Sequence, residues 1–511
     1  MYAKVKSLGL LGLDAYEVTV ECDISQGLPK FDLVGLPDAV VKESRERVRA
    51  SVKNCRLNFP LSRITVNIAP ADIKKEGSLY DLPVLVSILK ASGQLKGETE
   101  GCAFVGELSL DGEIRGVNGI LPMLIKARDK GVKSVIIPKA NEREGGVLDG
   151  IQVIPAENVI DVMLHLSGEK IIEPCKSLEE DEKERAYTVD FSEVKGQHEA
   201  KRALEIAAAG GHNCLMIGPP GAGKSMLAKR LPTILPDMSF EEKLETTSVY
   251  SIAGKIPEGK ALVKRRPFRS PHYTVSAQAL TGGGAVIRPG EISLAHNGVM
   301  FMDEFPEFDR RAKESLRQPI EDGVVNISRA SGSVTYPSSI MLVAAMNPCP
   351  CGYYGHPTKE CKCTDAAKKR YMDKISGPIL DRIDIHIEVA PVEYEQLSAK
   401  SKEEGSAEIK KRVDKAREIQ RKRFQGTGVT CNAKMTPKMT KEFCVLSPDA
   451  DNLLKLSFER LGLSARAYDK ILRLARTIAD LEGSENIEMP HIAEAVQYRS
   501  LDRKYWNSEE L

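Results

Sequence analysis

The sequence lacks any apolar run long enough for a transmembrane helix, and it lacks an excess of charge of either sign. Nowhere do about eighteen apolar residues follow one another, and Met1–Lys6 does not begin the apolar stretch of a signal peptide. The 73 Lys and Arg residues nearly balance the 72 Asp and Glu residues, for a formal net charge of +1. We therefore expect no membrane partner, and any basic surface for nucleic acid must be local.

A disulfide framework is also missing. The eleven cysteines are an odd number and mostly scattered, which favours a reducing compartment, and we expect a cytoplasmic protein. Internal repeats and low-complexity tracts are absent as well. The length of 511 residues, with 42% hydrophobic and 28% charged residues, is typical of a globular protein of two to four domains.

Hydrophobic patterning divides the chain into four segments. Alternation over Tyr16–Cys22 and Ile64–Ile68 predicts strands, and Ala39–Asn54 has the pattern of an amphipathic helix. From about Tyr187 strands alternate with helices, as in a doubly wound parallel sheet, and helical periodicity follows a loose joint at 398–405. We predict an α+β domain over 1–166, a charged linker over 167–186, an α/β core over 187–396 and a helical domain over 397–511.

Eight residues near the middle of the chain fit the phosphate-loop pattern, between a short apolar strand and a helix. They read Gly218-Pro219-Pro220-Gly221-Ala222-Gly223-Lys224-Ser225. The glycines let backbone amides point at a polyphosphate, and the helix N-terminus adds a positive field. Lys224 would bind the outer phosphates and the Ser225 hydroxyl a Mg²⁺ ion. The alternative is a chance glycine-rich turn, but the flanking strand and helix favour a nucleoside triphosphate site.

A second apolar strand, Val299–Met302, ends in Asp303 and Glu304. Ligands of open α/β sheets bind at the carboxyl ends of the strands, which is where these carboxylates are expected. Asp303 is placed to hold Mg²⁺ through water, and Glu304 to polarise the attacking water. Alone this pattern is weak, but behind a phosphate loop it indicates an NTP hydrolase.

With both motifs the chain resembles the AAA+ ATPases, whose remaining parts can be assigned from the resemblance. Val194–Gln197 resembles the segment that packs on adenine, and Asn347, which ends an apolar strand, resembles the first sensor. Arg382, in Ser376–Asp384, resembles the arginine finger, and Arg466 resembles the second sensor, on the γ-phosphate. A finger acting in trans implies a ring, most often a hexamer.

Each arginine also has a simpler interpretation. Arg382 could form a surface pair with Asp384 in its own chain, and Arg466 could be a solvent-facing helix residue.

Further motifs resemble the magnesium-chelatase and MCM-helicase branch of AAA+ proteins. An insertion between the two phosphate motifs includes Arg265–His272 and Thr281–Gly290, and Val324–Ser328 with Ser333–Tyr336 predicts a β-hairpin before the first sensor. In that branch both features point into the ring's pore. Together with Met346–Gly355 and the N-terminal domain, they resemble the bacterial ComM (YifB-type) magnesium-chelatase-like proteins over nearly the whole chain.

This resemblance implies a homo-hexameric, ATP-hydrolysing DNA motor acting on branched or duplex DNA, as a helicase or branch-migration factor in recombination or natural transformation. Local basic clusters could neutralise DNA phosphates, although a charge run is more often a solvated helix face. The clusters are Lys264-Arg265-Arg266, Lys368-Lys369-Arg370, and the helix with Lys410, Lys411, Arg412, Arg417, Arg421, Lys422 and Arg423.

Two Cys-x-Cys turns follow the first-sensor strand, separated by nine residues: Cys349 and Cys351, then Cys361 and Cys363. Four thiolates at this spacing could close a structural Zn²⁺ site, with His356 as a substitute ligand. The alternative is four packed or redox-active thiols.

The N-terminal domain, through Gly106–Ile114 and Ser134–Asn141, resembles the proteolytic domain of Lon, which has a ribosomal S5 domain 2-like fold. That enzyme uses a Ser–Lys dyad. Here the lysine position falls on Leu121, and Ser78 lies one position from the serine, so we expect a retained fold without peptidase chemistry.

Two other functions compete with the DNA motor. One is a chelatase-type, ATP-driven remodeller of a partner complex, and the other an ATP-dependent protease, which Leu121 disfavours. The chelatase motor subunit, as the resemblance has it, lacks the Lon-like domain and the Cys-x-Cys pairs, and both features favour the DNA motor.

Overall fold

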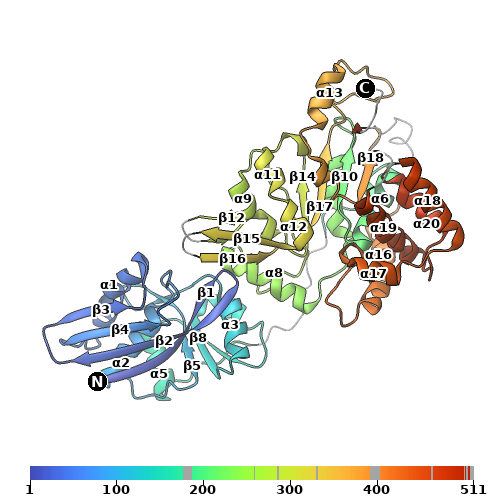
Figure 1. Ribbon diagram of the computed structural model, residues 1–511. Helices are drawn as coiled ribbons and strands as arrows, with labels where there is room; N and C mark the ends of the chain where they lie inside the picture. The colour runs from blue at the N-terminus through green and yellow to red at the C-terminus, as the bar shows by residue number, and fades with distance from the viewer. Residues whose placement is uncertain are drawn as a thin grey trace.

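The computed structural model describes residues 1–176, 187–257, 259–284, 287–329, 332–391, 403–461, 464–499, 501 and 505–506. Three predicted features lie wholly or partly outside the described residues: the joint at 398–405, the centre of the linker and the tip of the hairpin. Figure 1 shows an N-terminal domain, a central α/β domain and a C-terminal group of helices. Within the described part of the chain, no helix is both long and apolar enough to cross a membrane.

The N-terminal domain is built on a seven-stranded mixed sheet in the order β3-β4-β2-β1-β5-β8-β9. The predicted strands at 16–22 and 64–68 are confirmed inside β2 and β4, and the predicted helix over 39–54 is α1. Asp38 caps that helix by accepting a hydrogen bond from the Val41 amide at 2.7 Å. The strands are β1 (Tyr2–Leu11), β2 (Asp14–Ser25), β3 (Lys30–Val34), β4 (Arg63–Ala69), β5 (Cys102–Phe104), β8 (Ser134–Pro138) and β9 (Gln152–Ala156). The main helices are α1 (Ala39–Asn54), α2 (Asp81–Ala91), α3 (Ile120–Asp129) and α5 (Val159–Ser167), with a short α4 (Glu142–Gly145).

The central domain confirms the predicted parallel sheet. Its five strands run in the order β11-β14-β17-β10-β18, and every neighbouring pair is parallel. The strands are β10 (Cys214–Ile217), β11 (Phe268–Arg269), β14 (Val299–Met302), β17 (Met341–Met346) and β18 (Ile385–Glu388). The three middle strands are apolar throughout and buried, as expected of a parallel sheet covered on both faces.

The edge strand β11 corrects one prediction. Phe268 and Arg269 were assigned to the insertion, yet they pair with Val299 and Met300 of β14 and so belong to the sheet. A strand of two residues between Pro267 and Pro271 has no period for a sequence pattern to reveal.

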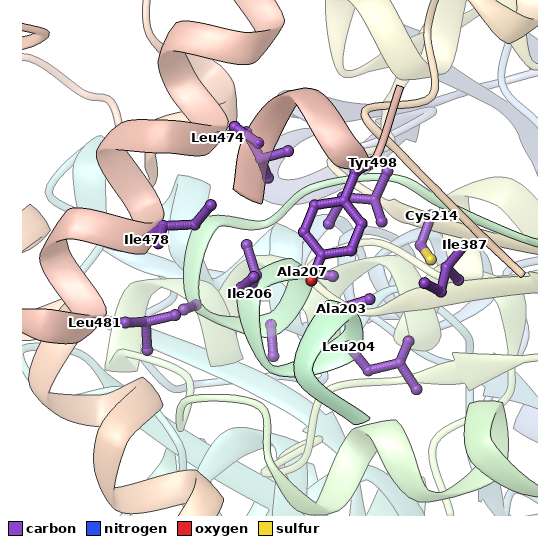
Figure 2. Packing of buried hydrophobic residues seen from close by; sticks show 14 of the residues in the cluster. Ala203, Leu204, Ile206, Ala207, Cys214, Ile387, Leu474, Ile478, Leu481 and Tyr498 are labelled. Atoms are coloured by element: carbon purple, nitrogen blue, oxygen red, sulfur yellow. The ribbon is translucent and has the colours of Figure 1, made fainter. Parts of the chain in front are cut away.

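One face of this sheet is covered by α6 (His198–Gly210), α7 (Lys224–Arg230) and the C-terminal helices. Figure 2 shows Leu474, Ile478 and Leu481 of α19 facing Ile206 of α6. The C-terminal helices are α16 (Ser406–Arg423), α17 (Pro437–Phe443), α18 (Pro448–Leu461), α19 (Ala465–Glu482) and α20 (Met489–Gln497).

The other face carries α12 (Arg317–Asp322) and the hairpin of β15 (Val324–Arg329) and β16 (Gly332–Pro337), which confirms the predicted hairpin. Tyr505 also packs there, and its hydroxyl donates to Glu388 at 3.1 Å. Tyr505 and Trp506, which follow the C-terminal helices in the sequence, therefore pack against the central domain.

The N-terminal and central domains are in contact at the helix over 240–253 and at the β15–β16 hairpin, among other places. Helix α3 packs on α8 (Phe240–Ala253), where the Ser251 hydroxyl donates to Glu144 at 2.6 Å and the Gly119 amide donates to the Ser251 carbonyl at 3.1 Å. At the second place the β1–β2 turn at Gly12 lies against Val334 of the hairpin, which extends toward β1 in Figure 1.

Candidate active site

The predicted phosphate loop joins β10 to α7, at the carboxyl edge of the sheet. Gly221 and Gly223 have φ angles of +80° and +93°, a region that glycine adopts without strain. A Cβ atom at either residue would meet no atom within 4 Å, so open space faces both. The loop thus leaves room beside its backbone, and α7 begins directly after it at Lys224.

Lys224 is buried and turned back over this loop. Its Nζ atom donates to the carbonyls of Gly218 at 2.6 Å and Pro219 at 3.0 Å, and to the amide oxygen of Asn347 at 3.1 Å. Burial lowers the pKa of Lys224 to about 8, with Asp303 acting in the opposite direction. A cation that touches only neutral oxygens in a buried place is well suited to bind an anion.

Two residues from different elements meet beside Lys224. The Ser225 hydroxyl donates to the Asp303 carboxylate at 2.5 Å, although 78 positions separate them. Asp303 also accepts from the Glu304 amide at 3.0 Å. Glu304 is exposed and has a φ of +53°, a left-handed conformation that is costly for a residue with a side chain and that recurs at functional sites.

The segment predicted to pack on adenine also reaches the phosphate loop. The side-chain amide of Gln197 donates to the Ala390 carbonyl at 2.6 Å and to the Ala222 carbonyl at 3.3 Å. Val194–Gln197 therefore lies between the loop and the end of β18. The structure brings these predicted residues together around one edge of the sheet.

The two predicted arginines lie elsewhere. Arg382 precedes β18, whereas Lys224 follows β10, and the two strands are parallel neighbours. Residues before one strand and after the other stand at opposite edges of the sheet, separated by about 13 Å of strand at 3.3 Å per residue. Arg382 pairs with Glu321 and donates to the Pro378 carbonyl at 2.7 Å.

Arg466 is exposed near the start of α19, whereas the preceding Leu463 lies outside the described residues. The hydrogen bond from Arg382 lowers the pKa of the Glu321 carboxyl, and against the opposing effect of burial the charge of Arg466 lowers it further. Both arginines therefore act on one carboxylate.

The predicted alternative for Arg382, a pair with Asp384, is wrong. The Asp384 carboxylate lies 2.9 Å from the Lys470 ammonium and 3.5 Å from His212 Nδ1, and it accepts from the Asn213 amide at 3.1 Å. Sequence analysis missed both Glu321 and Lys470, because only tertiary contacts bring them to their partners. The sequence did contain one relevant pattern: Lys470 lies one helical turn after Arg466, so both side chains are expected on the same face of α19.

The four predicted thiols form a cluster. The Sγ atoms of Cys349, Cys351, Cys361 and Cys363 all lie within 4.8 Å of one another. Three of the separations are 3.4, 3.6 and 3.7 Å, close to the roughly 3.8 Å between sulfurs of a tetrahedral site with 2.3 Å bonds. Burial, which would raise the pKa of Cys351, is outweighed by backbone hydrogen bonds and the neighbouring thiols, so this pKa falls to about 6.

His356, the predicted substitute ligand, is not part of this cluster. Its Nδ1 atom accepts from the amides of Thr358 and Lys359, both at 3.1 Å, within its own turn. The loop that carries the four cysteines touches the phosphate loop at Gly352. A Cβ atom at this residue would collide with the Pro220 ring, so the two loops are in close contact here.

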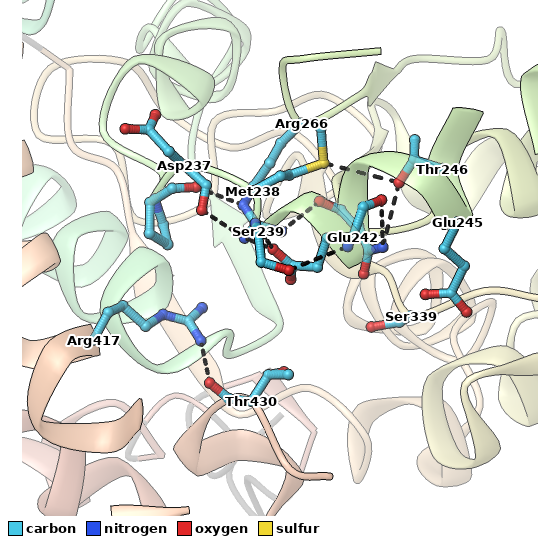
Figure 3. Close-up of polar contacts among 12 residues, drawn as sticks. Asp237, Met238, Ser239, Glu242, Glu245, Thr246, Arg266, Ser339, Arg417 and Thr430 are labelled. Atoms are coloured by element: carbon cyan, nitrogen blue, oxygen red, sulfur yellow. Dashed lines mark hydrogen bonds and ion pairs between the residues drawn. The ribbon is translucent and has the colours of Figure 1, made fainter. Parts of the chain in front are cut away.

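Most of the predicted basic clusters are engaged within the chain. Figure 3 shows Arg266 among the polar groups around Glu242. It donates to that carboxylate at 2.8 Å and to the Pro236 and Asn297 carbonyls at 2.6 and 2.8 Å. In α16, Arg412 binds Glu205 and Glu404, and Arg423 binds Asp480. These arginines support the fold, so they are poor candidates for phosphate contacts.

The residues considered for a peptidase do not form a dyad. Leu121 is fully buried in the core of the N-terminal domain, and the Ser78 hydroxyl donates to the Glu107 carboxylate. A carboxylate partner differs from the lysine that a Ser–Lys dyad needs.

The central sheet has five parallel strands, a phosphate loop after β10 and two acidic residues after β14. This combination defines a AAA+ ATPase. Comparison with known proteins narrows the class. The family model for magnesium chelatase, subunit ChlI, matches residues 190–397, and its C-terminal counterpart matches 403–499. A third model, for subunit ChlI of Mg-chelatase, matches residues 20–141.

Full-length relatives make the assignment closer. The chain is 44% identical to YifB of Escherichia coli K12, over 98% of this chain and 97% of that protein. It is 42% identical to the competence protein ComM of Haemophilus influenzae, over 98% of each chain. The 38 kDa subunit of magnesium chelatase from Chlorobaculum parvum is 22% identical over 59% of this chain and 87% of that subunit. The chain belongs to the ComM/YifB-type, magnesium-chelatase-like AAA+ ATPases.

Proposed function

We propose that this protein is an ATP-hydrolysing motor of a homo-hexameric ring that moves branched or duplex DNA. The observation that carries the proposal is the separation of the predicted site into two halves. Lys224, Ser225, Asp303 and Asn347 gather at one edge of the sheet, and Arg382 and Arg466 stand away from them. Two half-sites on opposite edges suit subunits that complete each other's sites.

The residues at the carboxyl edge fit ATP with Mg²⁺. The open space beside Gly221 and Gly223 admits phosphates to the backbone amides, and the buried Lys224 supplies a cation for the outer phosphates. The Ser225 hydroxyl and the Asp303 carboxylate offer the oxygen donors that Mg²⁺ prefers. When bound, this ion neutralises charge on the phosphates.

In this mechanism Glu304 accepts the proton of the attacking water, and Asn347 orients that water. Asn347 is positioned for this because its amide oxygen already accepts from Lys224 at 3.1 Å. Arg382 of a neighbouring subunit neutralises charge that develops on the γ-phosphate, an effect worth on the order of 10³ or more in rate. Arg466 binds the same phosphate.

DNA as the substrate is supported by the ComM relative, named for competence, and by the hairpin and insertion. The root of the insertion borders a cleft of 570 Å³ whose lining includes Lys255, Arg269 and His272. Glu291 accepts from Arg269 at 2.7 and 2.8 Å and lies 3.6 Å from the Lys255 ammonium, so His272 is the better candidate for a contact with phosphates. Recombination and natural transformation are both compatible processes.

The deciding experiment is steady-state ATPase of the purified protein, alone and with linear, forked and four-way-junction DNA. The Glu304→Gln variant corrects for contaminating hydrolases. Stimulation by the branched forms supports the proposal, with branch migration as the process. Turnover that no DNA changes would instead favour a chelatase-type remodeller acting on a partner complex.

That second function is favoured by one finding, the match of three ChlI family models. Because one of these models covers residues 20–141, the N-terminal region does not by itself distinguish this chain from chelatase subunits, contrary to the expectation from sequence. The four-cysteine loop remains as the distinguishing feature.

We further propose that this loop holds a structural Zn²⁺ ion. Cys349, Cys351, Cys361 and Cys363 provide four sulfurs at nearly tetrahedral spacing, and in a loop rich in polar residues and proline the ion would replace a hydrophobic core. Metal analysis of freshly purified protein should give one zinc per subunit. Well under one, in protein handled without chelators, would count against the site.

For the N-terminal domain we propose a Lon-protease-like fold that assembles the ring or docks DNA and cleaves no peptide bond. The buried Leu121 and the Ser78–Glu107 hydrogen bond support this assignment. Peptidase activity that disappears in Ser78→Ala would contradict it.

A further inference from the structure

The finger candidate Arg382 is held by one carboxylate in its own chain. Its guanidinium binds Glu321 and donates to the Pro378 carbonyl, and only 13% of its side chain is exposed, against 50% for Glu321. A planar guanidinium binds an acidic oxygen pair or a phosphate through the same fork of N–H groups. Glu321 and a phosphate therefore compete for Arg382.

Glu321 also belongs to the root of the hairpin. It lies in α12, which ends at Asp322, and only the capping residue Gly323 separates this helix from β15. The Ser338 amide donates to the Gly323 carbonyl at 2.7 Å and closes the base of the hairpin. A displacement of Glu321 can therefore be transmitted to both strands of the β15–β16 hairpin through only a few residues.

The far part of the hairpin contacts the N-terminal domain through Val334 and Gly12. The chain of contacts thus runs from Arg382 through α12 and the hairpin to the β1–β2 turn, as the arrangement in Figure 1 allows.

We propose that Glu321 is a positioning residue that holds Arg382 in the resting subunit and gives it up to the γ-phosphate of a neighbour. Its release changes the root of the β15–β16 hairpin, so the state of one subunit's nucleotide reaches the pore hairpin of the next. This inference rests on the proposed function, in which Arg382 acts in trans.

The test is Glu321→Gln, which keeps the shape of the side chain and removes the charge. The matched control is Glu418→Gln, because Glu418 lies in α16, is 51% exposed and pairs with Arg421 at 3.3 Å. Without DNA we expect kcat for ATP hydrolysis to rise about threefold or more in Glu321→Gln, with KM for ATP unchanged. A merely structural role would lower kcat together with thermal stability.

Two further variants sharpen the result. Glu321→Asp keeps the charge with a shorter reach and should give an intermediate kcat. The double variant Glu321→Gln/Arg382→Ala should be as inactive as Arg382→Ala, because the gain depends on the arginine. An unchanged or lower kcat in Glu321→Gln, or a gain that survives loss of Arg382, would overturn the proposal.

Hydrogen exchange of peptides covering 324–337 provides the second readout. Exchange should be faster in Glu321→Gln than in the wild type or Glu418→Gln, and equal exchange would contradict a link to the hairpin. Both measurements are made without DNA. If no DNA changes the rate of ATP hydrolysis by the wild type, the DNA-motor proposal fails. The inference about Glu321 is still decided by these two experiments.

Discussion

The ammonium nitrogen of Lys470 lies 2.9 Å from a carboxylate oxygen of Asp384, and this ion pair joins α19 to the segment that carries Arg382. Arg466 stands one helical turn before Lys470. The pair therefore fixes both candidate γ-phosphate ligands as one unit at the edge of the sheet away from Lys224.

Breaking the Asp384–Lys470 pair should destabilise the protein. Asp384→Asn leaves a buried ammonium unpaired, at a cost of about 3–5 kcal/mol. The surrounding charges hold the pKa of Asp384 well below its usual value against the effect of burial, so its contribution is present above about pH 4 and is lost as pH falls further. Calorimetry should show a large difference between variant and wild type at pH 7 and a smaller one below pH 4. Asp365→Asn, which removes a surface pair with Lys368, should cost at most about 1 kcal/mol.

Glu304→Gln should bind ATP without hydrolysing it. The amide keeps the size of the side chain but cannot accept a proton, so we expect kcat to fall by about 10² or more while nucleotide affinity is retained. Equilibrium binding and single-turnover hydrolysis measure the two properties separately. Near-normal turnover would mean that the general base is another residue.

Lys224→Ala should lose ATP binding, and the wild-type affinity should depend on pH. Since the pKa of Lys224 is about 8, the free protein binds ATP best below pH 8, where the amine is charged. Affinity should fall as pH rises from 7 to 9, and this fall should be missing from the weak residual binding of Lys224→Ala. Fluorescence titration with a labelled nucleotide measures both, and a pH-independent wild-type affinity would show that the charge of Lys224 is unimportant.

Arg382→Ala should assemble into rings but not hydrolyse ATP. Mixing it with Lys224→Ala provides a sharp test, because one variant keeps the phosphate loop and the other keeps the finger. Mixed rings should recover a fraction of wild-type turnover although each variant alone is inactive. Absence of recovery in rings proven to be mixed would argue that Arg382 acts only within its own chain.

Removing zinc should weaken nucleotide binding through the contact between Gly352 and Pro220. We expect Cys351→Ser to lose the metal and to raise KM for ATP several-fold. Cys175→Ser changes a cysteine that packs against the core of the N-terminal domain, outside the cluster, and should change neither quantity. If Cys351→Ser loses the metal but keeps the KM of the wild type for ATP, the ion stabilises only its own loop and does not affect nucleotide binding.

The elements that sequence analysis found are those with a strong local signal. Alternation predicted β2 and β4, periodicity predicted α1, and paired apolar strands around a turn predicted β15–β16. Strand β11 was missed because two residues between prolines carry no period, and its membership in the sheet depends on β14. The partners of Arg266 and Arg412 could not be predicted either, since they are distant in sequence.

A phosphate loop and an acidic strand end are short motifs whose roles follow from local geometry, so the class of chemistry could be predicted from the order of residues alone. Tertiary structure decided how the parts are distributed. The parallel order of β10 and β18 sets Lys224 and Arg382 at opposite edges, and side-chain packing selected Glu321 rather than Asp384 as the partner of Arg382. Such pairings depend on positions in space that no run of neighbouring residues encodes.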